Sequence, residues 1–251
     1  MLTANHNFIL PDESLQKLID HYWFINVANN VNNGDHYQIH LQSGCNEWFM
    51  CYNDSYNETY LGNNNIGYPK SIICGPRSLE KRLVFKNFSP DFKGVRIRFK
   101  PTGFFKLFGI PGDLLQNGIF LPEDVLGNQV LELHDQMESA SNDASRVSIL
   151  NRFFIKKLQI KKTYKISVER LGSAIDFIKS NAMSVKIGVL GEILNLSSRS
   201  LERDFNTILG LNPKEYTNEI MSILGISVFD KTSVKELLTE SQINQIFKRT
   251  R

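Results

Sequence analysis

The chain has 251 residues, of which 41% are hydrophobic and 22% charged, a composition typical of a soluble globular protein with one large or two ordinary domains. No apolar run reaches the length of a membrane span, and the opening MLTANHNFILPDESL lacks the basic and apolar segments of a secretory signal. The three cysteines, Cys45, Cys51 and Cys74, form no CxxC motif and fit a reducing cytosol. We therefore expect a cytoplasmic protein that contacts no membrane and carries no cofactor.

The net charge of +3 conceals an uneven distribution. Residues 1–144 hold 11 Lys/Arg and 16 Asp/Glu, a net of −5, whereas residues 145–251 hold 18 Lys/Arg and 10 Asp/Glu, a net of +8. A basic C-terminal half is common where that end contacts nucleic acid, although a solvated charged surface explains the charge alone equally well.

The first hundred residues predict short strands separated by Asn, Gly and Asp turns, including 36–41 and 47–52. In 94–100, GVRIRFK, the apolar residues alternate with Arg96, Arg98 and Lys100, as in a half-buried strand. Such strands predict a small barrel or sandwich.

Helices are predicted after Pro101. A short helix at 104–108 is closed by Gly109, and two amphipathic helices follow, separated by cap residues at 141–143. Their apolar faces contain these residues: Val130, Leu133, Met137 and Ala140 in the first, and Val147, Leu150, Phe154 and Leu158 in the second. This pair is a candidate dimer surface, and packing on the chain's own strands explains it as well. The basic KKTYK at 161–165 is the expected linker.

The stretch 190–216 has the pattern of a helix-turn-helix. Gly191 is the small residue required where the helices cross, and Asn195 tolerates the left-handed conformation of the turn. Ser197 is placed to cap the second helix and Gly210 to end it. Asn-Pro-Lys-Glu at 212–215 then opens another helix.

The predicted outward face of the second helix contains Ser198, Arg199, Ser200, Glu202, Arg203 and Asn206. Arginine pairs with guanine, glutamate accepts from cytosine, and Ser or Asn bonds bases or phosphates, so this face favours DNA contact. The alternative is an ordinary solvated surface.

The sequence ILNLSSRSLERDFNTILGLNPKEY resembles the first helix-turn-helix of the AraC family, and the segments HYWFIN, IHLQSGCNEWF, CGPRS and GVRIRFKPTGFFKLFGIPGDLL resemble the sensor domain that often precedes it. The resemblance implies a bacterial transcriptional regulator with a cupin-like sensor barrel. By position it places Arg199, Glu202 and Arg203 at base edges and Ser200, Asn206 and Lys214 at phosphates.

The family pattern fails after Ile220. A second helix-turn-helix does not fit, because Leu238 and Phe247 are 9 residues apart whereas the matching Gly191 and Phe205 are 14 apart. We therefore expect a divergent or truncated second unit at the end of the chain.

The expected fold class is α+β and multidomain: a sensor and dimerisation domain at 1–162, β-rich and cupin-like and then helical, an all-α helix-turn-helix unit at 163–226 and a divergent tail at 227–251. The expected function is sequence-specific binding of double-stranded DNA, weak for a monomer, with a possible homodimer and a small-molecule effector as further partners.

Two other functions stay open. One is a sensor and dimerisation protein that has lost DNA binding. The other is a metal-dependent cupin enzyme, because His36 and His40 share a strand face near Glu47, although cupins use a His-x-His pair. We expect no enzyme. An anionic effector has weak candidate ligands in Arg77, Arg96 and Arg98, which could equally be solvated.

Overall fold

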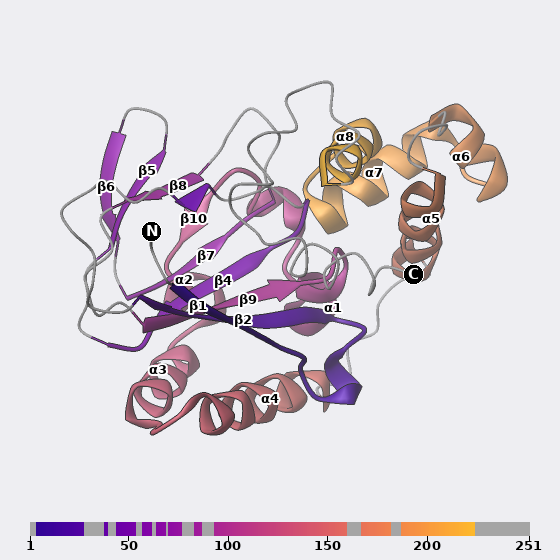
Figure 1. Cartoon of the computed structure of the whole chain (residues 1–251). Coiled ribbons are helices and arrows are strands. Elements are labelled where there is room, and N and C mark those ends of the chain that lie inside the picture. The colour runs from indigo at the N-terminus through magenta and orange to yellow at the C-terminus, as the bar shows by residue number, and fades with distance from the viewer. Residues whose placement is uncertain are drawn as a thin grey trace.

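A computed structural model of the chain describes residues 4–27, 38–39, 44–53, 57–61, 64–68, 70–76, 83–86, 93–159, 167–181 and 187–223. Figure 1 shows helices on two sides of a twisted antiparallel sheet: α3 and α4 lie below it, and α5 to α8 lie at the upper right. The predicted tail at 227–251 and the predicted linker at 161–165 fall outside the described residues.

The larger sheet has six strands in the order β1-β2-β9-β4-β7-β10, all antiparallel to their neighbours. Its strands are β1 (Ala4–Ile9), β2 (Ile19–Val27), β4 (Glu47–Cys51), β7 (Ser71–Cys74), β9 (Lys93–Phe99) and β10 (Ile119–Phe120). The alternation predicted at 94–100 is confirmed, because Val95, Ile97 and Phe99 are fully buried while Arg96 and Arg98 lie on the other face, partly buried.

A smaller sheet lies at the upper left of Figure 1, on the side of the larger sheet opposite α3 and α4. Its strands are β3 (Gln38–Ile39), β8 (Leu83–Lys86), β5 (Asn57–Leu61) and β6 (Asn64–Tyr68), in that order. The described strands thus form two open sheets, and the expected barrel is not closed within them. The fold is mixed α and β, as predicted.

Short helical elements connect the strands to the long helices. They are η1 (Glu13–Leu15), α1 (Gly103–Phe108), η2 (Gly112–Leu114) and α2 (Pro122–Leu126). The predicted end of α1 is confirmed: Gly109 adopts a left-handed φ of 72° and its N–H donates to Phe105.

The two predicted amphipathic helices are α3 (Gln129–Ser139) and α4 (Asp143–Gln159), and they pack on the larger sheet. The ring of Phe154 lies 6.4, 6.2 and 5.7 Å from the rings of Tyr22, Trp48 and Phe99, which come from β2, β4 and β9. The predicted cap is also present, because the Ser145 N–H donates to Asn142 Oδ1 at 2.9 Å.

The apolar face of α3 and α4 therefore covers the chain's own sheet, which accounts for its pattern without a dimer. Val130, Leu133, Met137 and Leu150 are buried there. Leu158 was predicted on the same face but is 42% exposed, because it lies at the last turn of α4, beyond the sheet contacts made by Phe154.

The C-terminal helices are α5 (Ser167–Asn181), α6 (Ile187–Ile193), α7 (Ser198–Leu209) and α8 (Pro213–Ile223). They enclose a second core, separate from that of the sheet, centred on Leu190, Leu201, Phe205 and Tyr216. Phe105 of α1 packs against this core from the sheet side. No helix of the described residues is long and apolar enough to cross a membrane.

Replacing Phe154 with Ala should lower the free energy of unfolding by about 3 to 5 kcal/mol, because the ring fills the space between α4 and three strands. Chemical denaturation measures this loss. The control is Leu158→Ala on the same helix, where the 42% exposed side chain should cost less than about 1 kcal/mol. Equal losses in the two variants would contradict the packing of Phe154 against the larger sheet.

Candidate nucleic-acid interface

The turn between α6 and α7 has the backbone that the sequence predicted. Asn195 adopts a left-handed φ of 54°, and the Leu196 N–H donates to the Gly191 carbonyl at 2.9 Å. A Cβ on Gly191 would lie 2.9 Å from the Leu196 carbonyl oxygen, which is too close for any side chain. The glycine is therefore required for the approach of the turn to α6.

Both ends of α7 are capped as predicted. At the start of the helix, the Ser197 Oγ accepts from the Ser200 N–H at 3.2 Å. At its end, Gly210 adopts a φ of 72° and its N–H donates to the backbone carbonyl of Asn206. A capping box then starts α8: the Asn212 N–H donates to the Glu215 carboxylate at 2.8 Å, and the Glu215 N–H donates to the Asn212 side-chain oxygen at 2.9 Å.

One face of α7 is buried and the other is open to solvent. Leu201, Phe205, Ile208 and Leu209 lie in the helical core, and the Phe205 ring packs edge-on against Tyr216 at 5.9 Å. The exposed residues of α7 include Ser198, Arg199, Glu202, Arg203 and Asn206, and Lys214 of α8 is exposed as well. Ser200 is only partly exposed, since it lies beside Ser197 in the cap. The structure thus places the predicted residues between 198 and 206 on α7, and Lys214 on α8.

Arg203 is already engaged in an ion pair. Its guanidinium lies 3.3 Å from Asp204 Oδ1, although its side chain remains 69% exposed. Asp204 is buried, so the pair joins the solvent face of α7 to its core-facing side. The sequence placed Glu202 near this arginine but did not identify Asp204 as its partner.

The basic excess of the C-terminal half does not lie on these helices. Residues 167–223 hold six Lys/Arg and seven Asp/Glu, a net of −1. Residues 145–166 hold seven Lys/Arg and no Asp/Glu, a net of +7, and most of this segment is α4. Since phosphate contacts depend on Lys and Arg, the helix-turn-helix has little charge of its own for binding DNA.

Arg96 and Arg98, the weak candidates for binding an effector, lie on the sheet face away from α4. Carboxylates of the chain lie close to both of them. Arg96 forms an ion pair with the buried Glu47, and its guanidinium lies 5.2 Å from the Trp23 ring centre. Burial by itself would lower the pKa of Arg98, but nearby groups, Glu47 first among them, outweigh burial and raise it. The two positive charges are therefore offset locally, which disfavours an anionic effector here. Arg77 lies outside the described residues.

The cupin-type metal site is not assembled from described residues. His36 and His40 fall outside them, and Glu47 is committed to Arg96. Within the described ranges, no three His, Cys, Asp or Glu side chains lie together as a metal site would require.

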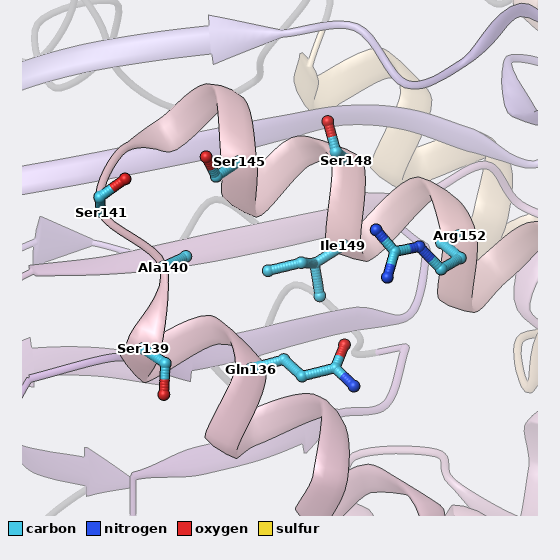
Figure 2. Close-up of a pocket in the computed structure, with 8 residues that line it drawn as sticks. All are labelled: Gln136, Ser139, Ala140, Ser141, Ser145, Ser148, Ile149 and Arg152. Carbon is cyan, nitrogen blue, oxygen red and sulfur yellow. The ribbon is translucent and has the colours of Figure 1, made fainter.

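A solvent-open groove of about 590 Å³ lies between the end of α3 and the first turns of α4. Figure 2 shows that four serines, Gln136, Ala140, Ile149 and Arg152 line it. Two of the serine hydroxyls donate to carbonyl oxygens of their own helices: Ser139 to Asp135 and Ser148 to Ala144. We assign this groove no part in nucleic-acid contact.

Glu219 of α8 is a buried acid that sequence reasoning missed. It is 1% exposed, and neither of its carboxylate oxygens has a hydrogen-bond partner among the described residues. Burial, and to a smaller extent the negative charge of Glu215, raises the pKa of Glu219 to about 7. Its position three residues after the buried Tyr216, on the same side of the helix, was the available signal that it faces the core.

A family model described as a domain of unknown function (DUF6597) matches residues 7–120, which run from β1 to β10. No curated protein matches the chain.

Among solved structures, the chain is distantly similar to ToxT from Vibrio cholerae. The ToxT structure from strain O395 has a TM-score of 0.39 and 13% identity, over 87% of this chain and 88% of that one. A 1.65 Å structure of ToxT has a TM-score of 0.37 and 12% identity, over 87% and 95%. Wild-type ToxT of strain SCE256 with bound unsaturated fatty acid has a TM-score of 0.39 and 12% identity, over 87% and 92%.

Glu219→Gln should remove a pH dependence of stability. The folded pKa of about 7 lies above the ordinary 4.5, so this residue favours folding at low pH, and that contribution is lost as the pH rises through 7. The free energy of unfolding in urea should thus fall by roughly 2 kcal/mol more in the wild type than in the variant between pH 5 and pH 8.

The control for this experiment is Glu192→Gln, an exposed acid on α6, which should behave as the wild type does. An equal pH dependence in Glu219→Gln and in the wild type would show that the Glu219 carboxyl is not held in an unfavourable environment.

Proposed function

We propose that the protein is a sequence-specific, DNA-binding transcriptional regulator of the AraC type, and not an enzyme. The observation that carries this proposal is the unit α6–turn–α7, in which the left-handed Asn195 and the Gly191 contact fix α7 with one apolar face buried and one polar face exposed. An α-helix presented in this way fits the major groove of duplex DNA.

The residues of the exposed face take different roles in this proposal. Arg199, Glu202 and Arg203 contact base edges, and for Arg203 this means exchanging the Asp204 ion pair for a base. Ser200, Asn206 and Lys214 bind phosphates, which sets the register of α7 on the duplex, and Ser198 contacts the DNA from the same face. The list of contacts is short, so a single copy binds weakly.

Binding as a homodimer would raise the affinity, because two copies of α7 would then read half-sites about one helical turn apart. In the same proposal, residues 1–162 form the sensor and dimerisation domain, 163–226 the first helix-turn-helix unit and 227–251 a divergent tail. A small-molecule effector of this regulator would bind the sensor domain, in the cytoplasm.

The double variant Arg199→Ala, Arg203→Ala should weaken binding to DNA. We expect fluorescence anisotropy with a random-sequence duplex at low salt to show at least a tenfold loss in affinity, since two cationic contacts of about 1 kcal/mol or more each disappear. Binding of the wild type should weaken steeply with added salt.

Arg152→Ala is the matched control, because Arg152 is an exposed arginine of α4, below the sheet in Figure 1. It should leave the affinity nearly unchanged. If the wild type does not bind random duplex at micromolar concentration and low salt, the proposal of DNA binding is wrong.

A second candidate is a sensor and dimerisation protein without DNA binding, and one observation favours it. The net charge of −1 on residues 167–223 is unusual for a unit that neutralises phosphates. The same titration separates the two functions, and sedimentation of the pure chain would then show whether it forms a dimer.

A further inference from the structure

The end of α7 approaches the sheet side of the molecule closely at two glycines and Pro76. A Cβ on Gly112, in η2, would lie 2.5 Å from the Leu209 carbonyl carbon and 2.6 Å from the Gly210 nitrogen. A Cβ on Gly210 would lie 2.3 Å from the Gly112 carbonyl oxygen and 2.9 Å from Pro76 Cγ. No side chain fits on either partner without separating the two segments. We call this contact of Gly112, Gly210 and Pro76 the glycine clamp.

The two glycines are needed for different reasons. Gly210 also caps α7 with a left-handed φ of 72°, so its conformation alone favours glycine. Gly112 is buried and starts η2 without a left-handed φ. The absence of a side chain at Gly112 therefore serves the close approach to α7, which makes it the cleaner position for a test.

On the sheet side, the residues that follow β7 are hydrogen-bonded to the segment that follows η2. The Gly75 N–H donates to the Gly118 carbonyl at 3.1 Å, and the Asn117 N–H donates to the Pro76 carbonyl at 2.8 Å. A Cβ on Gly75 would lie only 1.6 Å from the Leu115 carbonyl oxygen. Backbone contacts thus run without interruption from β7 through η2 to the end of α7.

Tyr216 of α8 makes a second contact between the two sides. A Cβ on Gly44, just before β4, would lie 3.1 Å from the Tyr216 ring, and Tyr216 is fully buried. Phe105 of α1 packs on the same helical core. These contacts leave the exposed face of α7 uncovered, because Arg199, Glu202 and Asn206 remain exposed in the docked arrangement.

We propose that the glycine clamp holds α7 on the larger sheet as one cooperative unit and thereby fixes the orientation in which α7 meets DNA. The second half of this statement rests on the proposed function. Because the clamp contacts the end of α7 and leaves its polar face open, the docked arrangement is the one that binds DNA, and changes in β7 or η2 reach α7 through it.

The test uses Gly112→Ala and Gly112→Val in the full chain, with Gly172→Ala as control. Gly172 lies in α5, and a Cβ there would meet no atom within 4 Å, so this substitution adds the same methyl group without a clash. The milder Gly112→Ala guards against a Gly112→Val chain that fails to fold.

The first measurement is thermal unfolding followed by two signals. Both tryptophans of the chain, Trp23 and Trp48, lie in the larger sheet, so fluorescence reports on the sheet while circular dichroism at 222 nm reports on all helices. We expect coincident transitions in the wild type and in Gly172→Ala. In the Gly112 variants, part of the helical signal should be lost at a lower temperature than the fluorescence signal. Coincident transitions in all four proteins would overturn the clamp.

The second measurement is binding to random duplex at low salt, where Gly112→Val should bind severalfold more weakly than Gly172→Ala although every residue of α7 is unchanged. Tighter or equal binding by Gly112→Val would overturn the role of the clamp in presenting α7. Absence of DNA binding by the wild type would instead reject the proposed function, and the unfolding experiment would still decide whether the clamp joins the two sides.

Discussion

The burial of one face of α7 is the constraint on which the candidate interface depends. Leu201, Phe205 and Ile208 point into the helical core, and Phe205 packs against Tyr216 of the next helix. Because a helix turns by a fixed angle per residue, burying these positions leaves Arg199, Glu202, Arg203 and Asn206 in solvent. The caps at Ser197 and Gly210 set where this helix begins and ends. Packing, more than charge, therefore defines the face that is offered to a partner.

The basic residues of this chain are not concentrated on the helices that form the candidate interface. The helix-turn-helix is close to neutral, while the basic residues are concentrated on α4 and just beyond it. In the proposed function, α7 would therefore depend on hydrogen bonds at base edges and on a second copy for affinity. Glu219 adds an acid to the same helical core, where its carboxylate has no hydrogen-bond partner among the described residues and burial raises its pKa.

The two sides of the molecule are joined by close contacts at glycines as well as by Phe105 of α1, which packs on the helical core. The sheet core and the helical core are separate clusters, each explained by its own apolar residues. Their junction depends on the space left at Gly44, Gly112 and Gly210, where backbone meets backbone or an aromatic ring. Glycine allows this approach because it has no Cβ. The apolar face of α3 and α4, which the sequence predicts as a candidate dimer surface, is covered by the larger sheet. There Phe154 packs against residues of three strands.

The sequence by itself determined the local features of this protein. The alternation in β9, the left-handed Asn195, the Ser197 cap and the Asn212–Glu215 capping box all follow from short-range rules, and the structure has each of them. Only the tertiary structure decided that the described strands form two open sheets, that Arg96 is paired with Glu47, and that Gly112 meets Gly210. Those features join residues far apart in the chain, so their geometry depends on how whole elements pack and not on the spacing of residues within one element.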